Sequence, residues 1–488
     1  MKLVELLKGI EIISSKGDMD VEINGIAYDS RKVKKGYLFI CVSGYTKDGH
    51  SFANDALRQG AVALLVEKDV EDVEGSGAVQ IKVANCRAAM PRLALNFYDD
   101  PTQRLKLIGI TGTNGKTTTT YLIKSILEKN GQRTGMLGTI STQIGDKVFV
   151  SSRTTPEALD LHCLFREMAD SNIDYAVMEV SSHSLELGRV EGCNFRVGVF
   201  TNLTQDHLDF HKTIENYRNA KKKLFYMTSG ANIINIDDEH GRIIADEVRS
   251  TATRLITYGI DNKADIMAKN IEISAKGVVF TLVTPEYETG LSIKIPGKFS
   301  VYNALAAASV AYVEGVPMEA IKEGLNRVDN VPGRSEILDT DTPYTVIVDY
   351  AHTPDGLQNI LASVKEYARG RVITLFGCGG DRDREKRPIM GKIAGRMSDY
   401  CIITSDNPRS EIPMEIIKQI EAGIKSTDCD YICIENRRDA IKYALTIAGK
   451  DDIVLLAGKG HETYQVLKDR TIPFDERDIV EELLREEL

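Results

Sequence analysis

The sequence predicts an α/β protein with three domains, and three observations lead to this prediction. Short apolar runs alternate with helix-like stretches along most of the chain, as expected for parallel sheets with crossover helices. Turn-forming residues interrupt this alternation at 99–101 (Asp-Asp-Pro) and at 331–334 (Val-Pro-Gly-Arg). The length of 488 residues also exceeds the roughly 150 residues typical of one domain. We therefore expect domains at residues 1–98, 99–332 and 333–488.

Each segment has its own series of predicted elements. In the first, strand-like runs at 37–42 and 61–66 flank a helix-like stretch at 51–59, which is typical of a small α/β unit. The second opens with an apolar run at 105–110 and a helix-like stretch at 117–129. The remaining apolar runs, of the kind buried in parallel sheets, lie at 175–180, 197–201 and 231–236 in the second segment, and at 345–348, 372–376, 400–404 and 453–456 in the third.

The composition argues against several classes of function. With 61 basic and 71 acidic side chains the net charge is −10, which disfavours non-specific binding to nucleic acid. No apolar stretch approaches the roughly 18 residues of a membrane span, and charges within residues 1–8 argue against a signal peptide. Eight scattered cysteines without a CxxC pair are typical of reduced thiols. We therefore expect a cytoplasmic globular protein without a membrane span.

A phosphate-binding loop is predicted where an apolar strand leads through a glycine-rich turn into a helix. Backbone N–H groups of such a turn can approach phosphate oxygens. Lys116 can reach the β- and γ-phosphates, and the Thr117 hydroxyl can ligate Mg²⁺. The sequence departs from the pattern GxxxxGK[ST] at Ile110, where the first glycine would fall. The expected nucleotide-binding residues here are Gly112, Thr113, Asn114, Gly115, Lys116, Thr117 and Thr118.

Two further positions lie close to expected strand ends, where doubly wound sheets bind their ligands. Glu179 ends the run at 175–180 and is a candidate Mg²⁺ ligand, and His207 follows the next run. Taken alone, either residue would more often be structural. The basic run 221–223 would ordinarily be a solvated helix face, but one of its lysines can face the cleft because helix neighbours diverge by about 100°.

Seven short motifs follow one another along the chain. They are Gly-Thr-Asn-Gly-Lys-Thr at 112–117, Glu-Val-Ser-Ser-His at 179–183, Thr-Asn-Leu at 201–203, Asp-His-Leu-Asp at 206–209, Pro-Gly-Arg at 332–334, Asp-Tyr-Ala-His-Thr-Pro at 349–354 and Gly-Lys-Gly-His-Glu at 458–462. Their order and spacing resemble the Mur ligase family over essentially the whole chain. The resemblance implies a small N-terminal α/β domain for a uridine nucleotide, a central P-loop parallel-sheet ATPase domain and a C-terminal Rossmann-like α/β domain.

The resemblance also implies ATP and Mg²⁺ as cofactors and gives roles to individual residues. Lys221 aligns with a lysine that family members carry as a carbamate, which turns a neutral amine into an anionic oxygen ligand suited to Mg²⁺. The catalytic residues implied are Lys116, Glu179, His207 and Lys221, and the metal ligands are Thr117, Glu179, His207 and Lys221. Adenine-nucleotide contacts are implied for Asn303 and Arg334, and ribose or phosphate contacts for Asp349 and His352.

Within the family, the chain looks most similar to the diaminopimelate-adding branch. Asp406, Asn407, Pro408 and Arg409 correspond to the amino-acid-selecting motif of that branch, and lysine-adding relatives lack the arginine. Diaminopimelate differs from lysine by one carboxylate, which a guanidinium fork can bind through two hydrogen bonds. In isolation, the same four residues are equally consistent with an Asn-Pro turn carrying a surface arginine.

The same resemblance implies further substrate contacts. Leu187 departs from the family pattern, since some relatives carry a polar, substrate-contacting side chain there. The loop at 45–47 (Tyr-Thr-Lys) resembles a uridine-nucleotide contact. The other implied contacts are Ser30 for the uridine nucleotide, Thr154, Thr155, Ser181 and Arg189 for the diphosphate, sugar and peptide, and Arg387, Gly458 and Glu462 for diaminopimelate.

The reaction implied is ATP-dependent amide formation in peptidoglycan synthesis. The D-glutamate side-chain carboxylate of UDP-N-acetylmuramoyl-L-alanyl-D-glutamate attacks the γ-phosphate of ATP, and meso-diaminopimelate displaces phosphate from the acyl phosphate. We expect a monomer with small-molecule substrates only. Three alternatives stay open: a lysine-adding ligase, a folate ligase that ignores UDP substrates, and a nucleotide-switched scaffold that binds ATP without ligating anything.

Overall fold

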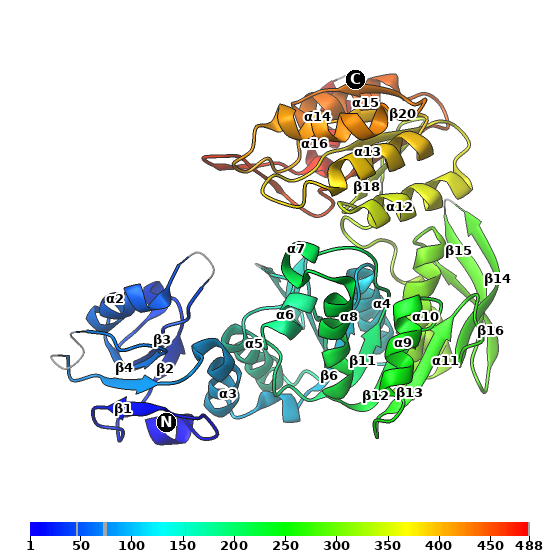
Figure 1. Ribbon diagram of the computed structural model, residues 1–488. Helices are drawn as coiled ribbons and strands as arrows, with labels where there is room; N and C mark the ends of the chain where they lie inside the picture. Colours follow the sequence, from blue (N-terminus) through cyan, green and yellow to red (C-terminus); the bar gives the residue numbers. More distant parts are fainter. Residues whose placement is uncertain (45–46, 72–75, 152, 275, 487–488) are drawn as a thin grey trace.

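The computed structural model describes residues 1–44, 47–71, 76–151, 153–274 and 276–486. Within these ranges, three large sheets follow one another along the chain, and each is packed against helices (Figure 1). The N-terminal sheet lies at one end of the molecule, the central sheet fills the middle, and the C-terminal sheet lies above it in this view. The α/β fold class predicted from the sequence is confirmed.

The N-terminal sheet has the strand order β1-β5-β4-β3-β2, parallel except for β1. Alternate residues of β3 and β4 enter two apolar clusters, one on each face. The helix α3 (Cys86–Tyr98) packs on one of these clusters and leads into the central region. The other elements are α1 (Leu3–Leu6), β1 (Ser14–Lys16), β2 (Gly25–Ala27), β3 (Tyr37–Ile40), α2 (Ala53–Arg58), β4 (Ala61–Val66) and β5 (Val79–Lys82).

The central sheet is parallel in its middle, with the order β13-β12-β11-β6-β10-β7. Helices α4, α10 and α11 pack on one face of the sheet. Helices α5, α8 and α9 contribute residues to the apolar clusters on the other face. The bounds are β6 (Lys106–Thr111), α4 (Lys116–Lys129), β7 (Thr134–Leu137), α5 (Ala158–Asp170), β10 (Tyr175–Glu179), α6 (Ser182–Glu186), β11 (Phe195–Phe200), α7 (Leu208–His211), α8 (Ile214–Lys222), β12 (Thr228–Asn235), α9 (Glu239–Val248), β13 (Arg254–Gly259), α10 (Lys298–Val313) and α11 (Met318–Asn326).

Further strands extend this sheet at both ends, with antiparallel pairing everywhere except between β13 and its next neighbour, and the sequence analysis did not identify them. The strands β8 (Ser141–Ile144) and β9 (Lys147–Val150) follow β7, while β14 (Ile266–Ser274), β15 (Gly277–Val283) and β16 (Glu288–Ile293) follow β13. The side chains of β14 and β16 are partly exposed, and those of β9 are exposed throughout. Polar residues within β14 and β16 interrupt the continuous apolar run by which buried parallel strands are recognised, whereas β9 and β15 contain short apolar runs that the sequence analysis did not assign.

The C-terminal sheet is doubly wound, with the order β17-β18-β22-β19-β20-β21 and an antiparallel strand only at β17. Helices α12, α13 and α14 pack on one face, and α15 and α16 on the other. The bounds are β17 (Glu336–Leu338), β18 (Thr345–Asp349), α12 (Pro354–Tyr367), β19 (Val372–Phe376), α13 (Lys386–Met397), β20 (Tyr400–Ile403), α14 (Pro413–Ile424), β21 (Asp430–Cys433), α15 (Arg437–Ile447), β22 (Ile453–Ala457), β23 (Tyr464–Val466), β24 (Thr471–Pro473) and α16 (Glu476–Glu486).

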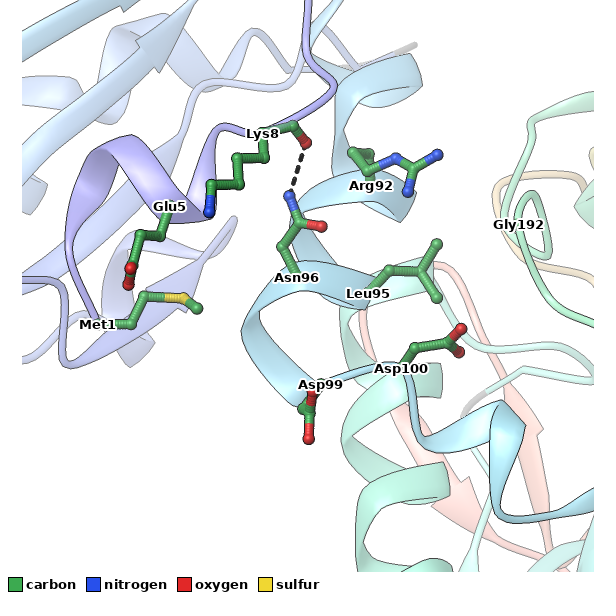
Figure 2. A pocket seen from close by; sticks show the side chains of 9 residues that line it. All are labelled: Met1, Glu5, Lys8, Arg92, Leu95, Asn96, Asp99, Asp100 and Gly192. Carbon is green, nitrogen blue, oxygen red and sulfur yellow. Dashed lines mark hydrogen bonds between the residues drawn. The ribbon is translucent and has the colours of Figure 1, made fainter.

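Two cavities lie where different parts of the fold meet. The larger, of about 620 Å³, lies between the carboxyl ends of the central strands and α12. The smaller, of about 420 Å³, lies where α1 and α3 meet the loop at Gly192 (Figure 2). Its lining includes side chains of both charges, such as Arg92 and Asp100, and contains none of the predicted site residues. In the described part of the chain, no helix has the length and apolarity needed to cross a membrane.

Helices α13 and α14 approach so closely that their backbones touch. A Cβ atom at Gly423 would lie 1.8 Å from the carbonyl oxygen of Pro388, and one at Gly391 would lie 2.1 Å from that of Ile420. We expect Gly423→Ala to lower the free energy of unfolding by about 1–3 kcal/mol, because the helices must separate to admit the methyl group. Thermal or urea unfolding measures this change.

The matched control is Gly290→Ala in β16, where an added Cβ meets no atom within 4 Å. This substitution is expected to leave stability nearly unchanged. Equal destabilisation by both substitutions would contradict the close approach of α13 and α14.

Candidate active site

The glycine turn between β6 and α4 is closed by contacts that only glycine permits. A Cβ atom at Gly112 would lie 1.8 Å from Thr201 Oγ1, and one at Gly115 would lie 2.3 Å from Asn303 Oδ1. Gly115 also has φ +84°, in the left-handed region that glycine adopts readily. The turn is thereby pressed against the end of β11 and against α10, with the amino end of α4 facing the 620 Å³ cavity.

Two lysines donate to the same backbone carbonyl in this turn. Lys116 Nζ lies 2.9 Å and Lys221 Nζ 2.7 Å from the oxygen of Gly112, and Lys116 also donates to Thr113 O. Lys221 is only 1% exposed, and its Nζ lies 4.4 Å from the centre of the Tyr217 ring. Burial, reinforced by the neighbouring Lys116 charge, holds the pKa of Lys221 well below its usual range. Burial also lowers the pKa of Lys116.

Side-chain oxygens that could ligate a metal ion lie beside these lysines. The Thr117 hydroxyl donates to Glu179 Oε1 at 2.9 Å, and Thr139 donates its N–H to Oε1 and its hydroxyl to Oε2. A hydroxyl and a carboxylate are the hard ligands that Mg²⁺ prefers. The described residues contain no group of three or more His, Cys, Asp and Glu side chains that could hold a metal. The Thr117 hydroxyl and the Glu179 carboxylate would suit a Mg²⁺ ion whose other ligands include phosphate oxygens.

His207 lies at the edge of the same cavity within a cluster of rings. Its Nε2 atom is 3.3 Å from Asp206 Oδ2, and its ring centre is 4.7 Å from that of His183. Although the His207 side chain is 43% exposed, desolvation by the surrounding residues lowers its pKa to about 4 against the opposing charge of Asp206. The imidazole is therefore neutral near pH 7, which is the form that can accept a proton or ligate a metal.

The C-terminal domain supplies the opposite wall of the cavity. Arg334 Nη2 donates to Thr117 Oγ1 at 3.2 Å, and its guanidinium lies 4.5 Å from the centre of the Tyr350 ring. Asp355, at the start of α12, accepts hydrogen bonds from Asn114 at 2.6 Å and from Thr204 at 3.1 Å. The phosphate loop and α12 are thus held together directly.

The remaining predicted nucleotide contacts also line this cavity. Asp349 accepts backbone hydrogen bonds from Ser335 and Ala351, both at 2.7 Å, and burial raises its pKa. His352 Nδ1 lies 2.9 Å from Tyr350 O, and burial lowers its pKa. The lining residues that were expected from the sequence are Thr113, Asn114, Gly115, Lys116, Thr117, Thr118, Thr154, Glu179, Ser181, His207, Asn303, Arg334, Asp349 and His352.

Sequence analysis missed Thr139 and Asp355, which the structure places among the site residues. Thr139 follows a short strand and has no motif of its own, and only the fold brings it to Glu179. Asp355 directly follows the motif at 349–354 in the first turn of α12, and an acidic residue there is ordinary helix capping chemistry. No local sequence pattern marks either residue, so only the folded structure identifies them.

The predicted contacts for the UDP-linked substrate extend from the cavity toward the N-terminal sheet. Thr155 Oγ1 donates to the carbonyl oxygen of Glu179 at 2.9 Å, and Arg189 Nη1 donates to Thr155 O at 3.1 Å. Arg189 also pairs with Glu157 at 3.0 Å. Ser30 lies apart in a short 3₁₀ turn of the N-terminal domain. Within the predicted loop at 45–47, residues 45 and 46 lie outside the described residues.

The predicted amino-acid motif forms a second group, at the carboxyl ends of β20 and β22. Arg409, with φ +51°, donates through Nη1 to Gly380 O at 2.8 Å. Asn407 Nδ2 donates to Glu462 Oε2 at 2.8 Å, and Lys459 donates to the same oxygen at 3.0 Å. A Cβ atom on Gly458 would lie 3.1 Å from Asp406 Oδ2, and Pro408 sits between Asn407 and Arg409. These residues therefore share one site.

Arg387 belongs to the base of this group rather than to its open side. Its side chain is fully buried, and its two terminal nitrogens pair with both oxygens of Glu411 at 2.9 and 3.0 Å. It also donates to Gly379 O and to Gln419 Oε1. The guanidinium thus supports the chain segment that Arg409 contacts at Gly380, and its direct contact with substrate stays a prediction.

Two contacts connect the amino-acid group with the nucleotide cavity. Gly458 N donates to Asp349 O at 2.9 Å, and the rings of Tyr350 and His461 lie 4.8 Å apart. A Cβ atom at Gly333 would lie 2.1 Å from His461 N, so the segments at 333 and 461 are pressed together. A carboxylate activated in the cavity could therefore meet an amine held by the second group.

Family models match three consecutive regions of the chain. Residues 22–98 match the model described as Mur ligase family, catalytic domain. Residues 110–311 match the Mur ligase middle domain, and residues 333–460 match the model described as Mur ligase, glutamate ligase domain.

Individual relatives match over their full length. A UDP-N-acetylmuramoyl-L-alanyl-D-glutamate--2,6-diaminopimelate ligase of Caldanaerobacter subterraneus subsp. tengcongensis is 51% identical, covering 100% of this chain and 99% of the relative. The ligase of that name from Clostridioides difficile is 49% identical, with 99% of each covered. A solved structure of the same title is 32% identical with a TM-score of 0.69, covering 100% of this chain and 99% of its own. The chain belongs to the Mur ligase family.

Proposed function

We propose that the protein is an ATP-dependent ligase that joins meso-2,6-diaminopimelate to UDP-N-acetylmuramoyl-L-alanyl-D-glutamate in peptidoglycan biosynthesis. The observation that carries the proposal is the full-length likeness, near 50% identity, to curated ligases of diaminopimelate. The phosphate loop facing the cavity and the guanidinium of Arg409 beside the second group supply matching chemistry. Domain limits at 98/99 and 332/333 are part of the proposal, since each large sheet lies within one such segment.

The chain's own residues would drive the reaction chiefly through electrostatics. The attacking D-glutamate carboxylate and the triphosphate of ATP repel each other, and Lys116 and Arg334 lie where they can reduce that repulsion. Thr117, Glu179, His207 and a carbamate on Lys221 would hold Mg²⁺, which would supply additional neutralisation. The amine of diaminopimelate would then attack the acyl phosphate and displace phosphate. A carboxylate of the same diaminopimelate molecule would pair with Arg409. Closure of the C-terminal domain over the phosphate loop would exclude water.

We further propose a cytoplasmic monomer. All eight cysteines are free thiols, which supports a reducing compartment. The proposed substrates are small molecules, and the net charge of −10 disfavours a nucleic-acid partner.

The direct test is phosphate release with ATP, Mg²⁺ and the UDP-linked dipeptide. We expect meso-diaminopimelate to stimulate turnover and a UDP-tripeptide to form, with little release when L-lysine replaces it or when the amine is omitted. Mass spectrometry of the product identifies the added residue. Stimulation by lysine alone would keep the ligase and overturn the amino-acid assignment, whereas no stimulation by any amine would favour a folate ligase or a nucleotide-switched scaffold.

Substitution of Arg409 tests how the amino acid is selected. We expect Arg409→Ala to weaken use of diaminopimelate by about 2 kcal/mol or more, as when one partner of a desolvated charge pair is removed. Arg409→Lys keeps the charge and the backbone strain at φ +51° but loses the planar fork, so partial activity is expected. Steady-state kinetics with varied diaminopimelate measures both. Wild-type kinetics in Arg409→Ala would remove Arg409 from the substrate site.

Substitution of Lys221 tests the carbamate that the family resemblance implies. A buried lysine with a lowered pKa offers the neutral amine that carbon dioxide requires. We expect Lys221→Ala to be nearly inactive and formate or acetate to restore part of the rate in phosphate-release assays. Lys222, whose Nζ pairs with Glu247 at 2.8 Å, is the matched control, and Lys222→Ala should stay active. Full activity of Lys221→Ala would exclude a catalytic carbamate.

A further inference from the structure

A fully buried ion pair lies beneath the amino-acid group. Arg437 begins α15 and Glu476 begins α16, and their side chains are both 0% exposed. Arg437 Nε donates to Glu476 Oε1 at 2.8 Å. Both residues lie on the face of the C-terminal sheet that α15 and α16 cover, away from α13 and α14. Neither residue was singled out by the sequence motifs.

The other two nitrogens of Arg437 reach the ends of two strands. Nη2 donates to the carbonyl oxygen of Ala457 at 2.9 Å, and Nη1 donates to that of Ser405 at 3.5 Å. Ala457 ends β22, and Ser405 follows β20 by two residues. The next residue in each case, Gly458 or Asp406, opens one of the two loops that form the amino-acid group.

These two strand ends are not joined by the sheet itself. The order β22-β19-β20 places β19 between them, so ladder hydrogen bonds do not connect β22 to β20. The loops nevertheless meet beyond the sheet, where a Cβ atom on Gly458 would lie 3.1 Å from Asp406 Oδ2. A rigid planar guanidinium can bridge such a gap with fixed geometry.

Stability alone is a weak reason for such a pair. Taking a guanidinium and a carboxylate out of water is costly, and apolar residues of similar volume often replace buried ion pairs without loss of stability. The second oxygen of Glu476, Oε2, has no hydrogen-bond partner among the described residues, so the carboxylate is not even fully satisfied. The bridge to Ala457 and Ser405 is the feature that an apolar replacement could not reproduce.

We propose that Arg437 and Glu476 are a positioning pair that sets the spacing between the loop at 405–409 and the loop at 458–462, and so the affinity for the amino-acid substrate. Arg437 ties the two loop origins together, and Glu476 fixes the orientation of the guanidinium. Neither residue contacts the substrate. The inference rests on the proposed ligase function and adds a determinant of amino-acid affinity outside the sequence motifs.

The experiment separates positioning from stability through an apolar replacement of the pair. In Arg437→Met/Glu476→Met we expect thermal unfolding close to that of wild type, because the buried charges and their desolvation cost are removed together. The KM for diaminopimelate should rise about tenfold or more, as expected when a binding group is displaced by an ångström or less. The KM for ATP should change less than about twofold.

Two single variants complete the design. Glu476→Gln keeps the shape of the side chain and removes its charge, and it should also raise the KM for diaminopimelate. This variant provides the test if the double variant fails to fold. Arg438→Met is the matched control, because Arg438 is the next residue of α15 and pairs at the surface with Glu482 and Glu486. Its kinetics should match wild type.

The outcomes separate this inference from the proposed ligase function. Wild-type protein without diaminopimelate-stimulated turnover would contradict both. Active wild type together with an unchanged KM for diaminopimelate in folded Arg437→Met/Glu476→Met, or in Glu476→Gln, would overturn the positioning pair and leave the ligase intact. A rise in the KM for ATP equal to that for diaminopimelate would also overturn it, because it would indicate general loss of structure.

Discussion

The shared carbonyl oxygen of Gly112 is the point on which the rest of the site depends. Two lysines from distant helices donate to it, so two positive groups are held close together in a largely dry environment. Such an arrangement is stable only if one amine is neutral or if anions compensate the charge. The pKa of Lys221 is lowered accordingly, and the adjacent cavity suits a polyphosphate. The glycine turn makes this possible, because any Cβ at Gly112 would collide with Thr201.

The second constraint is that the site is divided between domains. The phosphate loop and Glu179 come from the central sheet, whereas Arg334 and Asp355 come from the segment that leads into and through the C-terminal domain. Direct hydrogen bonds from Asn114 to Asp355 and from Arg334 to Thr117 link the two. In the proposed ligase, a change in the relative position of the domains would therefore alter the charge around the phosphate loop.

Buried charges also support the amino-acid end of the site. Arg387 pairs with Glu411 below the segment that Arg409 contacts, and Arg437 pairs with Glu476 below the loops at 405–409 and 458–462. Arg387 also donates to the backbone carbonyl of Gly379, and Arg437 also donates to that of Ala457. Loops at the ends of parallel strands lack ladder partners, so side chains with several donors are an effective means of holding them.

The sequence by itself determined the fold class, the phosphate loop and the family. Continuous apolar runs mark β6, β10, β19 and β22 because both faces of these strands are buried, and the glycines at 112 and 115 mark a turn that no other residue can form. Only the tertiary structure decided the contacts of Thr139, Asp355, Arg437 and Glu476, and the edge strands such as β9. The reason is physical: hydrogen bonds between segments far apart in the chain leave no local pattern, and the apolar residues of the exposed strand β9 form a run too short to identify a strand by its periodicity.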